Sequence, residues 1–228
     1  MVQLNFGGTR LDGSFTTHTS DGTPVYSNFF GQSSFSRLAI VNASCLVKVP
    51  EDTSLPILAP LGCGMQTGAG AILNTLDVQP GDSVVITGTG AVGMAAIMAA
   101  RMCQAGVIIG VDIVSERLEL ASSLGATHTV NGADSNVASQ IKDICAIGVQ
   151  YAVDTTGIPE IVECMIDSLA PRGRAVSIGA PSPGSRVKID VFSQITMGRQ
   201  YIGCNQGDSV PQQVRKIAFP HLTPEETC

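Results

Sequence analysis

A glycine-rich segment, Gly88-Thr89-Gly90-Ala91-Val92-Gly93, is the part of this sequence whose residue types and spacing most clearly indicate chemistry. A short β-branched run at 83–87 precedes it, and a proline-free stretch rich in Ala and Met follows it. Between a strand and a helix, such glycines permit a tight turn at Gly88, close approach of a pyrophosphate at Gly90 and close helix–sheet packing at Gly93. Amide groups at the start of the helix would then bind the phosphates, assisted by the partial positive charge of the helix N-terminus. The segment therefore predicts a dinucleotide-binding turn.

Asp112 lies 19 residues after Gly93, at the end of the next predicted strand. A carboxylate in this position accepts hydrogen bonds from both hydroxyls of an adenosine ribose, whereas its charge would repel a ribose 2′-phosphate. We therefore expect NAD(H) to be preferred over NADP(H). The alternative interpretation is a tight strand–helix turn followed by an ordinary aspartate at a strand end.

The elements that must position these residues alternate between strands and helices from residue 61 to about residue 205. The apolar runs predict strands at 83–87, 107–111, 127–130, 150–153, 174–178 and 201–204. Helices are predicted at 91–105, 115–124, 137–144 and 159–169, the second of them capped by Ser115 and ended by Gly125. Near-continuous apolar strands separated by helices indicate an α/β fold with a parallel sheet covered on both faces.

The two ends of the sequence differ from this middle part. Residues 1–60 are rich in Gly, Ser, Thr and Phe, with β-like runs at 35–41 and 46–49 and turn signals at Asp12-Gly13 and Asp21-Gly22. This part is predicted to be a small irregular β region. Residues 208–228 contain three prolines within 14 residues and show no complete element.

The composition argues against several classes of protein. The 228 residues are 44% hydrophobic and 14% charged, which indicates a globular chain. The net charge is −6 and there is no basic stripe, so we expect no nucleic-acid partner. The longest apolar run, 91–100, is shorter than the roughly 20 residues that cross a bilayer, and no signal peptide is visible, so no membrane association is expected. The seven cysteines are scattered without a C-x-x-C, which argues against a disulfide framework or structural zinc site and favours a cytoplasmic location.

Several other segments of the sequence, taken together, match the pattern of one known family. Residues 60–70, PLGCGMQTGAG, place Cys63 25 residues before Gly88, and residues 28–36 read NFFGQSSFS. With segments 154–157, 177–181 and 198–200, they resemble the medium-chain, zinc-dependent alcohol dehydrogenases, most closely the aryl-alcohol (benzyl-alcohol) branch. The resemblance implies a Rossmann doubly wound parallel sheet plus a partial GroES-like β catalytic region. It divides the chain into a catalytic-domain remnant at 1–60, an NAD-binding domain at 61–207 and an atypical tail at 208–228.

The resemblance also implies a role for each matching residue. Cys63 would be one of three protein ligands of a catalytic zinc, and Thr67 would press on one face of the nicotinamide ring. Phe29 and Phe30 would wall an apolar pocket for a small-molecule aromatic or allylic alcohol, or its aldehyde. The cofactor residues would be Gly88, Gly90, Ala91, Val92 and Gly93 at the pyrophosphate, Asp112 and Arg117 at the ribose, Thr155, Thr156 and Ile158 beside the adenosine, and the backbone of Ile178, Gly179 and Ala180 at the nicotinamide.

Each of these roles has a plainer alternative. Cys63 could be a small buried apolar residue, Thr67 a helix cap, and Arg117 a solvated charge on a helix. Phe29 and Phe30 could be aromatic residues of a core.

The family pattern contains residues that this sequence lacks. A Cys and a Gly-His-Glu motif upstream of residues 28–36 would supply the other two zinc ligands, and the family continues beyond residues 208–211. We therefore expect a chain truncated at both ends. Because a catalytic zinc is normally held by three protein ligands, such a chain would bind NAD(H) without efficient alcohol oxidation.

Three functions remain open from the sequence. The first is an NAD-dependent, zinc-type alcohol dehydrogenase acting on a hydrophobic alcohol. The second is a catalytically inactive NAD-binding protein. The third is a zinc-free enone or quinone reductase of the same superfamily, against which Cys63 and Asp112 both count. A strand near 199–204 would suit an edge-to-edge homodimer.

Overall fold

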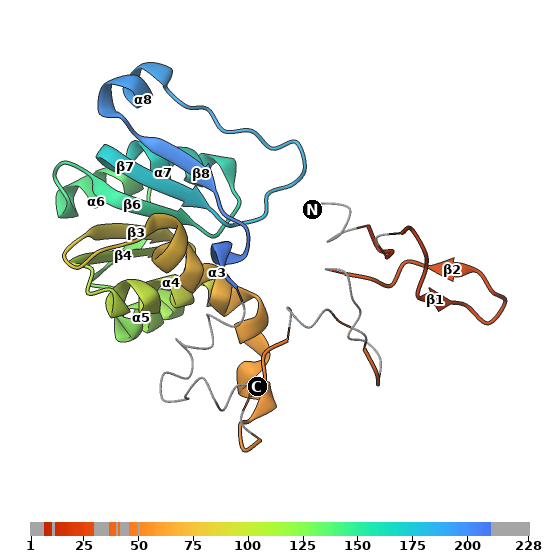
Figure 1. The fold of residues 1–228 in the computed structure, drawn as a ribbon. Helices are drawn as coiled ribbons and strands as arrows, with labels where there is room; N and C mark the ends of the chain where they lie inside the picture. Colours follow the sequence, from red (N-terminus) through yellow and green to blue (C-terminus); the bar gives the residue numbers. More distant parts are fainter. Residues whose placement is uncertain are drawn as a thin grey trace. The chain divides into compact units, whose positions relative to one another are not determined.

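A computed structural model describes residues 7–10, 12–29, 37–39, 41, 46–49 and 51–210. The described residues fall into two compact units, one ending at Val49 and the other running from residue 51 to Val210 (Figure 1).

The first unit contains a short antiparallel hairpin. Strands β1, Thr17–His18, and β2, Pro24–Val25, pair with Thr17 opposite Val25. Both turn signals are found as turns, because Gly13 and Gly22 adopt the left-handed backbone that favours glycine. The β-like runs are not strands where they can be described, since residues 37–39, 41 and 46–49 form no ladder; the rest of the first run lies outside the described residues.

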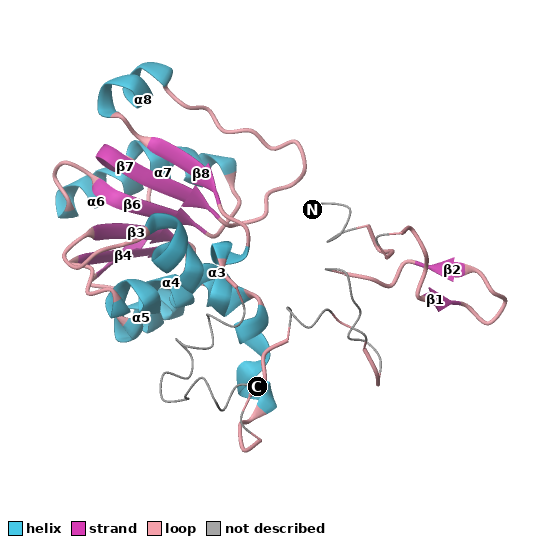
Figure 2. Ribbon diagram, viewed as in Figure 1, coloured by secondary structure: helices cyan, strands magenta, loops and turns pink. Residues whose placement is uncertain are grey.

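The second unit is built on a six-stranded parallel sheet in the order β5-β4-β3-β6-β7-β8 (Figure 2). The strands confirm the predicted α/β fold, although β7 begins five residues earlier than predicted. Their bounds are β3 Ser83–Thr87, β4 Val107–Asp112, β5 His128–Asn131, β6 Val149–Asp154, β7 Leu169–Ser177 and β8 Gln200–Gly203. The chain order reverses between β3 and β6, and ligands of open parallel sheets bind beyond the carboxyl ends of the strands at such a reversal.

Helices cover both faces of this sheet. One face carries α3 Gly64–Gly70, the π-helical segment η3 Ala71–Leu76, α4 Ala91–Met102 and α5 Ser115–Leu124, and the other carries α6 Val137–Ile144 and α7 Pro159–Asp167. Shorter elements are α2 Leu55–Leu58, η2 Ala59–Gly62, α8 Val191–Met197 and the 3₁₀ turn η4 Gln206–Asp208. Within the described ranges, none of these helices has the length and apolar character needed to span a bilayer.

The helix boundaries correct three predictions. Ser115 is the first helical residue and not the cap, because Val114 occupies the N-cap position and its amide is held by the Asp112 carboxylate. Helix α4 ends at Met102 rather than 105, where Gln104 turns left-handed and the amide of Ala105 bonds back to the carbonyl of Ala100. Helix α7 ends at residue 167 and not 169, since the following residues begin β7.

Two apolar cores sandwich the sheet. Alternate strand residues point to opposite faces: Ile86 packs toward α4, whereas Val85 packs toward α6 and α7. Both side chains are fully buried, as are Ile72 of η3 and Ile97 of α4. Burial of each such side chain stabilises the fold by roughly 1.5–3 kcal/mol. The carboxyl ends of the strands are therefore fixed by rigid packing.

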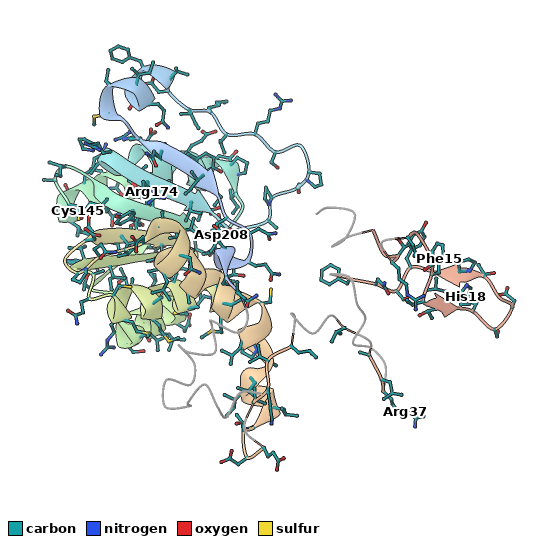
Figure 3. All side chains as sticks on the ribbon, viewed as in Figure 1. Phe15, His18, Arg37, Cys145, Arg174 and Asp208 are labelled. Carbon is teal, nitrogen blue, oxygen red and sulfur yellow. The ribbon has the colours of Figure 1, made fainter. Side chains whose placement is uncertain are left out.

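Arg174 of β7, labelled in Figure 3, connects the sheet to the end of η3 by hydrogen bonds. Its Nη1 and Nη2 donate to the carbonyl oxygens of Leu76 and Thr75, at 3.1 and 2.9 Å. These carbonyls belong to the last turn of the helical segment, where intrahelical donors run out. Arg174 therefore caps η3 from the neighbouring strand.

Arg174→Met is expected to lower the free energy of unfolding by about 1.5–3 kcal/mol, the usual contribution of hydrogen bonds from a charged group. Urea denaturation of the whole chain measures the change. Arg172→Met is the matched control, because Arg172 lies in the same strand but is exposed, and a change within about 0.5 kcal/mol is expected there. Equal effects of the two substitutions would contradict the capping role.

Candidate functional site

The glycine-rich turn joins β3 to α4 in a tightly fixed conformation. Gly88 has φ +83°, and its amide donates to the carbonyl of Val111 at 2.8 Å. The Thr155 hydroxyl donates to the carbonyls of Thr87 and Gly88, at 3.0 and 2.8 Å. A Cβ at Gly93 would overlap the carbonyl oxygen of Gly88. The turn is thus fixed to β4, to β6 and to its own helix.

The N-terminus of α4 is not covered by a capping side chain of the described residues. Gly90 is the N-cap residue, and no described side chain caps this helix end. A Cβ added at Gly90 would meet no described heavy atom within 4 Å. The first amide groups of an α-helix have no intrahelical partner and carry partial positive charge, so they can bind an anion such as a pyrophosphate.

Asp112, at the end of β4, is 7% exposed and binds the turn directly. Its Oδ2 accepts from the amide and the hydroxyl of Thr89, at 2.7 and 3.1 Å, and lies 3.7 Å from Nη1 of Arg117. Its Oδ1 accepts from the amide of Val114 at 3.0 Å. A carboxylate offers about four acceptor positions, so Oδ1 retains capacity for a hydroxyl of a ligand.

The environment of Asp112 keeps its carboxyl ionised. Burial by itself would raise the pKa of Asp112, because it penalises the charged form. The hydrogen bonds from Thr89 and Val114, together with the Arg117 charge, outweigh burial and lower the pKa. The Asp112 carboxyl is therefore an anion at neutral pH.

This lowered pKa predicts an acid-sensitive contribution to stability. Ionised Asp112 stabilises the fold fully above its ordinary pKa of 3.8, and the contribution is lost as the pH falls through the lower folded-state pKa. We expect the wild type to be more stable than Asp112→Asn at neutral pH, and the difference to shrink below pH 3.8. Urea denaturation across this range measures it; a difference that stays constant into strong acid would contradict the assignment.

A cavity of about 590 Å³ opens at the carboxyl ends of β3, β4 and β6. It brings together seven of the predicted cofactor residues: Gly88, Gly90, Asp112, Arg117, Thr155, Thr156 and Ile158. Sequence reasoning missed the rest of its wall, which includes Ile113, Asp134, Ser135, Asn136, Ala138, Ile141, Glu160, Ile161, Cys164 and Met165. Ile113 could have been found, since an apolar residue directly after the strand-end acid must either pack or face a ligand. The α6 and α7 residues carry no comparable signal.

The remaining predicted cofactor residues lie outside this wall. Ala91 and Val92 are in the first turn of α4. Gly179 lines a second cavity, of about 480 Å³, with Asp154 and Tyr201, and packs so closely on Gly157 that a Cβ would overlap its amide. Ile178 packs beside the core on the α4 face, and Ala180 is exposed.

Thr67 and Cys63 belong to one helical segment beside the turn. Cys63 is the N-cap residue of α3, and Thr67 lies inside this helix, 9% exposed, so it is not a helix cap. A Cβ at Gly68 would overlap the carbonyl oxygen of Val92. Helix α3 therefore packs against the first turn of α4, which places Thr67 near the glycine-rich turn.

The described residues do not fit a zinc ion. Cys63 is an exposed free thiol, and residues 7–210, where described, assemble no group of three His, Cys, Asp or Glu side chains. The five described cysteines are free thiols. Phe29 lies in the first unit and is 61% exposed, and Phe30 lies outside the described residues. No step that uses a metal can be derived from these side chains.

Comparison with known proteins identifies close relatives of this chain. Residues 91–223 match the zinc-binding dehydrogenase family. A geraniol dehydrogenase of Castellaniella defragrans is 37% identical over 93% of this chain and 57% of its own length. A probable alcohol dehydrogenase of a Pseudomonas species is 36% identical over 90% of this chain and 66% of its own length. The chain thus spans less than two thirds of these relatives.

Two solved structures also resemble this chain over nearly its whole length. An alcohol dehydrogenase zinc-binding domain protein from Burkholderia ambifaria superposes with a TM-score of 0.88 and 42% identity, over 99% of this chain and 62% of the other. A benzyl alcohol dehydrogenase from Acinetobacter calcoaceticus gives a TM-score of 0.86 and 39% identity, over 95% of this chain and 60% of the other.

Proposed function

Because this chain belongs to the zinc-binding dehydrogenase family, we propose that it binds NAD(H) in the cavity at the ends of β3, β4 and β6. We also propose that the whole protein transfers a hydride between a hydrophobic alcohol and NAD. The observation that carries the proposal is the ionised Asp112 carboxylate beside an uncapped helix that begins at a glycine.

Each part of the site has a task in this function. The amide groups that begin α4 hold the pyrophosphate, and Asp112 holds the adenosine ribose and repels a 2′-phosphate, which favours NAD(H) over NADP(H). Thr67 orients the nicotinamide from α3. Bound NAD⁺ supplies the acceptor for the hydride of an alcohol carbon, so that a carbonyl compound, NADH and a proton are formed.

The substrate is proposed to be a primary aromatic or allylic alcohol. Support comes from the names of two relatives, a geraniol dehydrogenase and a benzyl alcohol dehydrogenase. A homodimer is proposed through β8, which ends the described sheet and has β7 as its described neighbour. A cytoplasmic location stays a prediction from the cysteine content.

A second candidate function is NAD(H) binding without alcohol oxidation by this chain. It is favoured by the described donor set, which gathers no three metal-binding side chains around Cys63. The two functions share the cavity and differ only in turnover.

Calorimetric titration of NADH into the folded whole chain tests the binding proposal. We expect saturable heat at one site, and saturable heat with ADP-ribose, which retains the adenosine, the pyrophosphate and the second ribose of NAD(H) and lacks only the nicotinamide. Absence of heat with both ligands in folded protein would overturn it.

Turnover separates the two candidate functions. The whole chain is mixed with zinc, NAD⁺ and benzyl alcohol, and NADH is followed by absorbance. Turnover that disappears in Cys63→Ser supports the dehydrogenase, and absence of turnover in protein that binds NADH supports the binding function.

A further inference from the structure

We propose that the turn η4, Gln206–Asp208, is a positioning element that fixes helix α3 and thereby sets Thr67 against the nicotinamide. The inference rests on the proposed NAD(H) function. It adds a contribution from a segment that lines neither cavity and lies about 140 residues after Thr67 in the sequence.

The turn and the helix meet backbone to backbone. A Cβ at Gly207 would lie 2.5 Å from the carbonyl oxygen of Gln66, 2.9 Å from that of Thr67 and 2.8 Å from Cα of Gly70. Conversely, a Cβ at Gly70 would overlap the carbonyl oxygen of Gly207. Both elements thus need glycine where they touch. The turn lies directly against the peptide group of Thr67.

Side-chain hydrogen bonds also connect η4 to α3 and η3. Nε2 of Gln66, a residue that is 4% exposed, donates to Oε1 of Gln206 at 2.9 Å. Nδ2 of Asn74 donates to the carbonyl of Gly207 at 3.0 Å. The hydroxyl of the next residue, Thr75, donates to the Asp208 carboxylate at 2.8 Å. Figure 3 labels Asp208 in this turn. The hydrogen bonds thus attach the turn both near the start of α3 and near the end of η3.

The backbone of the turn is held in an unfavourable conformation. Gln206, Gly207 and Asp208 have φ of 54°, 69° and 44°, so three consecutive residues are left-handed and two of them are not glycine. Such residues persist only where surrounding contacts over-determine them, and they cluster at functional sites. The contacts to α3 supply that constraint.

Helix α3 is consequently held from two directions. Gly68 faces the first turn of α4, which carries the phosphate-binding amides, and Gly70 faces the turn η4. An isolated helical segment as short as α3–η3 is marginally stable, so its position is set by tertiary contacts. A displacement of η4 therefore moves Thr67 relative to the cofactor, whereas the cavity of about 590 Å³, which no residue of α3 or η4 lines, stays in place.

Gly207→Ala tests this role, with affinities for NADH and ADP-ribose measured by calorimetry on the whole chain. We expect the NADH dissociation constant to rise about tenfold, equivalent to about 1.4 kcal/mol, while that of ADP-ribose changes less than about twofold. A purely structural role would weaken both ligands together or lower only the melting temperature. Equal weakening, or no change in the NADH affinity, would overturn the proposal.

Gly184→Ala is the matched control, because Gly184 is also left-handed, with φ +87°, but no described heavy atom lies within 4 Å of its Cβ position. It carries the same backbone strain without the contact to α3. We expect both of its affinities to equal those of the wild type. A selective loss of NADH affinity in this control as well would attribute the effect to strain and reject the positioning role.

A second pair of variants keeps the proposal testable if Gly207→Ala does not fold. Gln206→Met removes the acceptor for Gln66, and Gln206→Glu retains one. We expect selective weakening of NADH with Met and recovery with Glu; identical affinities in the two variants would overturn the proposal. A wild-type chain that binds neither ligand would instead overturn the proposed function itself.

Discussion

Gly90→Ala is expected to weaken NADH binding at least about tenfold while leaving the stability of the protein nearly unchanged. The backbone at Gly90, with φ −72° and ψ −168°, suits any residue, and no described atom obstructs a Cβ there. The added methyl group enters the space in front of the α4 amides, where the pyrophosphate must approach. Calorimetry with NADH and thermal denaturation measure the two quantities.

Gly93→Ala is the contrasting variant. A Cβ at Gly93 overlaps the carbonyl of Gly88, so the helix must move away from the sheet and the free energy of unfolding is expected to fall by about 3 kcal/mol or more. The two alanines are three residues apart and chemically identical. If Gly90→Ala were the less stable of the two, or bound NADH normally, the assignment of Gly90 to ligand space would be wrong.

Asp112→Asn is expected to weaken NADH binding about 10- to 100-fold, the loss for one hydrogen bond to a charged group. The amide cannot carry the charge, and one of its ends presents donors where the carboxylate accepts from Thr89 or Val114. NADPH binding is expected to weaken less, because the repulsion of the 2′-phosphate disappears with the charge. Titration of both cofactors gives the ratio of their affinities.

Asp134→Asn is the control for Asp112. Asp134 lines the same cavity but is exposed, and its carboxylate is held by the Gln140 amide at 2.9 Å. We expect its NADH affinity to change less than about twofold. A similar loss in both variants would mean that the general negative charge of the cavity, and not the position of Asp112, determines cofactor affinity.

The sheet was predictable because its strands are continuous apolar runs, and all six were found to within a few residues except at the start of β7. The α3–η3 segment was not, because four of its thirteen residues, counting from Gly64 to Leu76, are Gly or Asn, which have low helix propensity. Its glycines are explained by tertiary contacts: Gly68 meets α4 and Gly70 meets η4. Helix α8 was also missed, although Asp190 caps it by accepting from the amides of Phe192 and Ser193.

The membership in the dehydrogenase family confirms the resemblance inferred from the motifs. The glycine spacing and the strand-end acid were sufficient to predict residues that line one cavity. The hydrogen bonds between Asp112 and Thr89 were not predictable, because Thr89 is simply a variable position in a G-x-G pattern. The contact of Gly207 with Thr67 joins segments far apart in sequence and follows only from the folded chain.

For the proposed NAD(H) site, the hydrogen bonds of Asp112 to Thr89 and Val114 limit how readily the cofactor preference can change during evolution or by design. Replacing Asp112 to admit a ribose 2′-phosphate also removes the acceptor of the Thr89 amide. The glycine-rich turn, which is proposed to bind the pyrophosphate, is then held less firmly. A single substitution of Asp112 is therefore expected to lower the affinity for NAD(H) without creating affinity for NADP(H). An efficient switch requires a simultaneous replacement at position 89 that stabilises the loop independently.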